Sequence, residues 1–178
     1  MQGVEAVHEP NNKAITRRMF SLLIITCIPL LIALVINLNN PDSELLRSIS
    51  AATSDLPALL SSQNLFLSSV LNAWCKTAPL WALVLVLLSI NEFQIKKDQD
   101  KGMMIKALIA FSVFYFVIIY MLLLHSAEIT ESGRLVRAMS QNDYLLTFLF
   151  VAVYAACFIL TTYYLLFIAA VCKTFGAK

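Results

Sequence analysis

A lysine between two apolar runs is the residue best placed to do chemistry in this chain of 178 residues. The stretch from Trp74 to Pro79 reads WCKTAP, and the segment around it is otherwise apolar enough to cross a membrane. An ammonium group at the centre of a bilayer costs about 2.5–3.5 kcal/mol, and less near its edge. Lys76 therefore needs an acceptor, from the protein or from lipid phosphate.

Pro79 follows Lys76 by about one helical turn. Proline cannot donate to the carbonyl of Cys75 and its ring tends to kink a helix, so a free backbone acceptor is expected beside the lysine. Glu128 and Asp143, in the loop that precedes the last apolar run, are candidate carboxylate partners. The alternative is simple extension of the lysine to lipid phosphate. If the acceptors belong to the protein, the charge of Lys76 would hold the kinked second helix against the other helices and so shape a surface for a binding partner.

The other residue types that support chemistry form no catalytic pattern. Apart from Lys76, the apolar segments contain no charged side chain, and such groups mark ion and proton pathways in membranes. The two histidines, His8 and His125, are predicted on opposite sides of the membrane. Neither a phosphate-binding glycine loop nor a zinc-ligand spacing is present. We therefore expect a protein that acts by binding, with no enzymatic activity, cofactor or metal.

Four apolar segments must position these residues. The chain is 60% hydrophobic and 13% charged, whereas a soluble domain carries about a quarter charged residues. About 20 helical residues cross the roughly 30 Å of hydrocarbon. The predicted spans are 19–38, 70–90, 107–124 and 144–171. The predicted fold class is all-α: a polytopic membrane protein with one domain over 1–178, a bundle of four transmembrane helices.

Basic residues in the flanking segments predict the orientation. Nine lie in 1–18, in the loop 91–106 and in the C-terminal tail, and three lie in the loops 39–69 and 125–143. The positive-inside rule then places both termini and the loop 91–106 in the cytoplasm, and the other two loops outside. The net charge of +2 follows from this asymmetry and gives no support to nucleic-acid binding.

Two arginines in the second outer loop run against this bias. Arg134 and Arg137 lie one helical turn apart and require an acidic partner. A local partner is favoured, because Glu128, Glu131 and Asp143 are near in sequence, but an external partner stays open.

The first outer loop contains a helical pattern. Asp42 is predicted to cap the helix and Pro57 to end it, and the apolar positions recur at helical spacing: Leu45, Leu46, Ile49, Ala52 and Leu56. Such a helix is expected to lie along the outer interface with its apolar face toward the acyl chains. The alternative is a docking surface.

The fourth span carries small and hydroxyl side chains at which helices can approach closely. They are Ala152, Ala155, Ala156, Thr161 and Thr162. They could seat a helix of the same chain or a foreign one, and the first reading is favoured because any bundle needs internal contacts.

A series of short motifs runs along most of the chain: Ile28-Pro29-Leu30-Leu31, Pro41-Asp42 with Leu45-Leu46-Arg47, Leu56-Pro57, Lys76-Thr77-Ala78-Pro79, and Glu128-Ile129-Thr130 followed by Gly133-Arg134. With these motifs the chain resembles the four-span colicin immunity proteins of the colicin A type. Each is short, but their order and spacing and the total length make the combination fairly specific. The middle loop and the tail carry fewer basic residues than this pattern, so the cognate colicin is left open.

The resemblance implies a protein of the bacterial inner membrane with both termini cytoplasmic. It would bind the pore-forming domain of its cognate colicin, chiefly through that domain's hydrophobic helical hairpin, and prevent channel opening. The competing interpretations are a small transporter or channel subunit and an assembly subunit of a membrane complex. The candidate binding or structural residues are Lys76, Pro79, Glu128, Arg134 and Arg137.

Overall fold

Four long apolar helical segments make up the computed structural model, which describes residues 12–93, 101–131 and 133–176. They are α1 (Asn12–Asn39), the consecutive helices α3 (Leu65–Cys75) and α4 (Ala78–Ser89), α5 (Lys101–Ile119) with a π-helical turn over Tyr120–Leu124, and α7 (Asp143–Gly176). The all-α class is therefore confirmed, and four helical segments are long and apolar enough to cross a membrane, as predicted.

The helices extend beyond the predicted spans at their charged ends. Lys13, Arg17 and Arg18 belong to α1, and Lys101 and Lys106 belong to α5. Long basic side chains can keep their charge at the membrane surface while the helix backbone continues inward. Residues 1–11 of the predicted cytoplasmic segment 1–18, and residues 94–100 of the predicted loop 91–106, lie outside the described residues.

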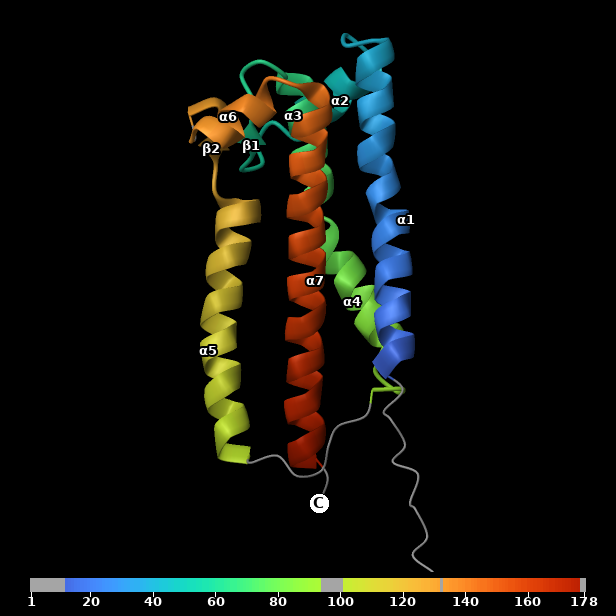
Figure 1. Cartoon of the computed structure of the whole chain (residues 1–178), viewed down its shortest axis with the longest axis vertical. Coiled ribbons are helices and arrows are strands. Elements are labelled where there is room, and N and C mark those ends of the chain that lie inside the picture. The colour runs from blue at the N-terminus through green and yellow to red at the C-terminus, as the bar shows by residue number, and fades with distance from the viewer. Residues whose placement is uncertain (1–11, 94–100, 132, 177–178) are drawn as a thin grey trace, which may run out of the picture.

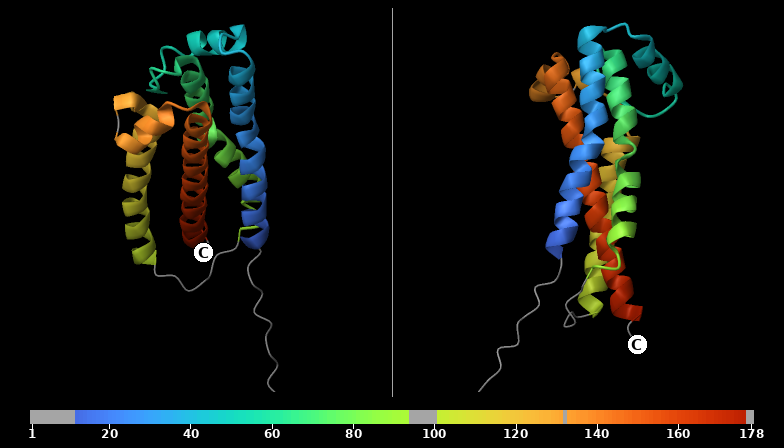
Figure 2. Two further views of the ribbon diagram at one scale, coloured as in Figure 1. Left: turned by 45° about the horizontal axis from the view of Figure 1, so that its top comes forward. Right: turned by 90° about the vertical axis from the view of Figure 1, so that its right-hand side faces the viewer.

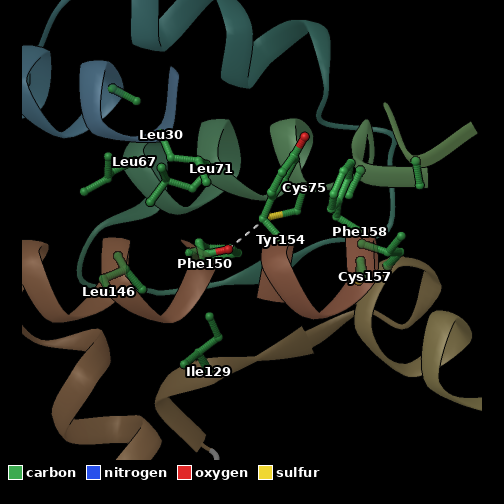
Figure 3. Packing of buried hydrophobic residues seen from close by; sticks show 14 of the residues in the cluster. Leu30, Leu67, Leu71, Cys75, Ile129, Leu146, Phe150, Tyr154, Cys157 and Phe158 are labelled. Carbon is green, nitrogen blue, oxygen red and sulfur yellow. Dashed lines mark hydrogen bonds between the residues drawn. The ribbon is translucent and has the colours of Figure 1, made fainter. Parts of the chain in front are cut away.

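The last helix is the centre of the assembly. α7 packs against α1, α3, α4 and α5, whereas α5 has extensive contact with α7 and little with the other spans (Figure 1). The buried side chains of α7 include Phe150, Tyr154 and Phe158, which belong to one apolar cluster with Leu30 of α1 and Leu71 of α3 (Figure 3). The arrangement is therefore a central helix with neighbours on two sides.

Aromatic and polar side chains join α5 to α7. The rings of Tyr115 and Tyr164 are stacked with centroids 4.2 Å apart. The hydroxyl of Tyr115 lies 3.3 Å from that of Thr161, and the Ser112 hydroxyl lies 3.2 Å from that of Tyr164. Such contacts matter in lipid, because burying apolar surface against another helix gains little there.

One end of the molecule carries short elements that cover it. They are α2 (Glu44–Ala52), β1 (Leu59–Leu60), β2 (Ala127–Glu128), a 3₁₀ turn (Ile129–Glu131) and α6 (Arg134–Ser140), and together they define what we call the capped end (Figure 1). The start of α1 and the end of α7 lie at the opposite end (Figure 2).

The predicted helix in the first loop is confirmed as α2, but both of its predicted ends are wrong. Ser43, not Asp42, is the N-cap, and its hydroxyl accepts a hydrogen bond from the amide of Leu46 at 3.4 Å. The helix ends at Ala52, because the backbone of Thr53, with φ −111° and ψ 9°, leaves the helical conformation. The hydroxyl of Thr53 donates to the carbonyl of Ile49 at 2.8 Å. α2 packs on α3 through buried Leu46.

Candidate functional site

The second span is broken at Lys76 and Thr77. α3 ends at Cys75, and the amide and hydroxyl of Thr77 donate to the carbonyl of Trp74 at 2.9 and 2.8 Å. Pro79 lies in the first turn of α4, where an N–H is not required. The second span is therefore interrupted beside Lys76, where a kink was predicted, and the interruption is a break after which Pro79 helps to start a new helix.

Lys76 has a backbone acceptor as its partner. Its Nζ donates to the carbonyl of Pro57 at 2.6 Å. The same carbonyl accepts from Nδ2 of Asn72 at 3.4 Å, and Oδ1 of Asn72 accepts from the amide of Leu59 at 3.3 Å. Lys76 and Asn72 thus fix the start of the segment 57–62, which contains β1 and which we call the β1 segment.

The predicted partners of Lys76 are not its partners. Within the described ranges, no ion pair joins Lys76 to Glu128 or Asp143. Oδ2 of Asp143 accepts instead from Nδ2 of Asn37 at 3.0 Å. The acceptor supplied to the lysine is the carbonyl of Pro57 and not that of Cys75. A side chain at the end of α3 leans toward the start of that helix, which lies at the capped end (Figure 1).

Glu128 holds the other end of the β1 segment. Its Oε1 accepts from the hydroxyl of Thr130 and from the amide of Ser62, the latter at 3.1 Å. β1 and β2 pair in parallel, with Leu60 opposite Glu128. These hydrogen bonds, with Thr130 as the largest contributor, lower the pKa of Glu128 below its usual value. Lys76 and Glu128 therefore act on one segment without touching each other.

The two arginines of α6 do not form the predicted local ion pairs. Nε of Arg137 donates to the carbonyl of Thr130 at 2.8 Å. Arg134 is exposed, and its side chain makes no ion pair or hydrogen bond with any other residue that the structure describes. Glu128 is engaged by Ser62 and Thr130, so the interpretation of local acidic pairing is wrong.

One face of α7 is left open along most of its length. Exposed side chains recur there at helical spacing, and we call them the α7 stripe: Leu145, Phe148, Ala152, Ala156 and Tyr163. Thr161 and Thr162 are buried within the chain, as the favoured interpretation predicted. For Ala152 and Ala156 that interpretation is wrong, because both are exposed.

Sequence reasoning missed the pairing of β1 with β2 and the openness of the α7 stripe. Two-residue strands carry no measurable periodicity. The stripe cannot be distinguished from a buried face, since lipid and protein interior select similar side chains. Among residues 12–93, 101–131 and 133–176, no three histidine, cysteine, aspartate or glutamate side chains gather as a metal site would require.

Comparison with known proteins identifies similar chains. The family model described as colicin immunity protein matches residues 42–178. The chain is 32% identical over 167 residues to the colicin-A immunity protein of Citrobacter freundii, covering 94% of this chain and 93% of the relative. It is 25% identical over 171 residues to the colicin-B immunity protein of Escherichia coli, covering 96% and 98%. No solved structure matches.

Replacing Lys76 by methionine is expected to release the start of the β1 segment. A hydrogen bond from a charged group contributes about 1.5–3 kcal/mol, so amide exchange in residues 58–61 should become about tenfold faster. Hydrogen–deuterium exchange of the protein in micelles measures this. Lys106→Met, which removes an exposed lysine at the opposite end of the molecule, is the control. Equal exchange in both variants would contradict the role of Lys76.

Glu128 is expected to make the β1 segment sensitive to acid. Because its pKa is lowered in the folded protein, its stabilising effect is complete above the usual value of 4.5 and is lost as the pH falls through the folded pKa. Protection of the Ser62 amide, corrected for intrinsic exchange, should therefore fall below about pH 4.5. Glu128→Gln keeps an acceptor without the charge and should remove this dependence. A Gln variant with an unchanged acid profile would assign it to another group.

Proposed function

The chain belongs to the colicin immunity protein family, so its function is bacteriocin immunity, and we propose that it protects by binding the pore-forming domain of its cognate colicin within the membrane. Colicin immunity proteins are inhibitory binding proteins. A ligand that prefers the closed, pre-channel state shifts the population by its differential affinity. A change from 1:99 to 99:1 requires a preference of about 10⁴. No catalytic step is needed.

The α7 stripe is the observation that carries this proposal. Its alanines, Ala152 and Ala156, lie one helical turn apart and are exposed between the larger side chains of Phe148 and Tyr163. Small residues let a second helix approach closely in lipid, where van der Waals packing drives association. The hydrophobic helical hairpin of a pore-forming domain has the matching chemistry. The stripe belongs to α7, the helix on which the other spans are assembled.

We further propose the bacterial inner membrane as the location, a single membrane domain and cytoplasmic termini. The distribution of basic residues supports this orientation, and the start of α1 and the end of α7 lie at the same end of the molecule, opposite the capped end (Figure 2). The capped end would then face the periplasm, from which the colicin inserts. A transporter or channel subunit would need a polar path, and the buried cluster is instead mainly apolar.

Expression in sensitive bacteria tests the function directly. Cells that make the chain should survive one or two members of a panel of pore-forming colicins that includes colicins A and B. They should remain sensitive to a nuclease colicin that enters by the same receptor, since only pore formation is blocked. Survival against no pore-forming colicin, with the protein present in the membrane, would contradict the proposal.

Enlarging the alanines of the α7 stripe should weaken protection. Ala152→Leu combined with Ala156→Leu would hold the hairpin away from α7 and lower the protective titre about tenfold, equivalent to about 1.4 kcal/mol of lost contact. Ala110→Leu, at an exposed alanine of α5, is the matched control and should protect normally. Immunoblots of membranes verify equal levels. Full protection by the double variant would contradict binding of the hairpin at the α7 stripe.

A further inference from the structure

We propose that a polar pocket at the capped end receives a basic side chain of the colicin, an inference that rests on the proposed function. The pocket has a volume of about 310 Å³ and lies where the end of α1, the turn before α3 and the first turn of α7 meet. Its polar lining residues are Asn37, Asp42, Ser62, Gln63, Asn64 and Asp143.

Two carboxylates of the pocket have no internal counterion. Oδ2 of Asp143 accepts a hydrogen bond from Nδ2 of Asn37 at 3.0 Å, and Asp42 is exposed. In the described part of the chain, no cation lies within ion-pair distance of either carboxylate. The guanidinium of Arg47 lies over the ring of Phe66, 5.7 Å from its centroid, and pairs with neither acid. The pocket therefore carries uncompensated negative charge.

A buried amide supplies a further acceptor. Asn37 is 6% exposed and lines the pocket. Because a carboxylate only accepts, the hydrogen bond to Asp143 fixes Nδ2 as the donor and leaves Oδ1 free to accept. No described residue donates to this Oδ1. A ligand with several N–H donors and a positive charge, the ammonium of a lysine or the guanidinium of an arginine, satisfies the carboxylates and this oxygen together.

The charge around the pocket favours a protein ligand with a cationic surface over a lipid amine. Asp42 follows the end of α1 and Asp143 begins α7, so the pocket lies at the ends of the spans. The segments at this end carry six carboxylates, Asp42, Glu44, Asp55, Glu128, Glu131 and Asp143, against four basic groups, Arg47, Lys76, Arg134 and Arg137. A net negative face accelerates the approach of a cationic surface and orients it.

The test is a binding titration in dodecyl maltoside with EDTA and no added lipid. The probe is the pore-forming domain of the colicin against which the wild-type chain protects. Asp42→Asn combined with Asp143→Asn should raise the Kd about tenfold and flatten its dependence on salt, because neutral amides keep the shape but not the charge. Asp55→Asn removes an exposed acid outside the pocket and should bind like the wild type.

The outcomes separate this inference from the proposed function. If the wild type does not bind the domain, the proposed function and the pocket both fail. If the wild type binds and the double variant has the same Kd and salt slope, the pocket alone is overturned. A loss that appears only when phosphatidylethanolamine or Ca²⁺ is added would also overturn it, in favour of a lipid amine or a metal ion. Equal thermal stability of the variants excludes a folding defect.

Discussion

Hydrocarbon leaves no water for an unpaired backbone group, and this constraint governs the break in the second span. The helix α3 ends at Cys75, and the hydroxyl of Thr77 donates a hydrogen bond to the carbonyl of Trp74. Pro79 lies in the first turn of α4 and has no N–H group that would need an acceptor. The indole of Trp74 donates to the carbonyl of Thr26 at 2.9 Å and thereby ties the break to α1. An interruption that would be costly in lipid is thus stabilised within the protein, and it leaves Lys76 directed toward the capped end.

The same solvent explains why the spans converge on α7. Apolar burial contributes little between helices in lipid, so close packing and hydrogen bonds decide which helices associate. The thiol of Cys75 donates to the carbonyl of Phe150 at 3.4 Å (Figure 3). The stack of Tyr115 on Tyr164 joins α5 to α7. Because α5 and the other spans occupy different sides of α7, the α7 stripe stays open. A foreign helix that packs there would contact the helix that already organises the fold.

Hydropathy predicted the four spans, and helical spacing predicted α2, because both signals are local. The partners of Lys76, Glu128 and Arg134 were mispredicted for the opposite reason. Opposite charges suggested ion pairs, but the structure gives Lys76 the carbonyl of Pro57 and Glu128 the amide of Ser62. Backbone carbonyls and amides are present at almost every residue, so the sequence does not indicate which of them will be a partner. Pro79 indicated where the second span is interrupted but not that a new helix starts there, because a proline inside a helix and a proline that starts one look the same in the sequence.

The β1 segment connects the membrane lysine to the pocket. Lys76 fixes its start at Pro57 and Glu128 fixes its end at Ser62, and Ser62 itself lines the pocket. A side chain inside the second span therefore positions a wall of the pocket at the span ends. The hydroxyl of Ser61 donates to the carbonyl of Ser140 at 3.1 Å, which ties the same segment to the end of α6, just before α7. These contacts hold the pocket and the α7 stripe in one position relative to each other. An inserting domain that binds its basic side chain in the pocket would therefore place its helices at a defined height along the α7 stripe.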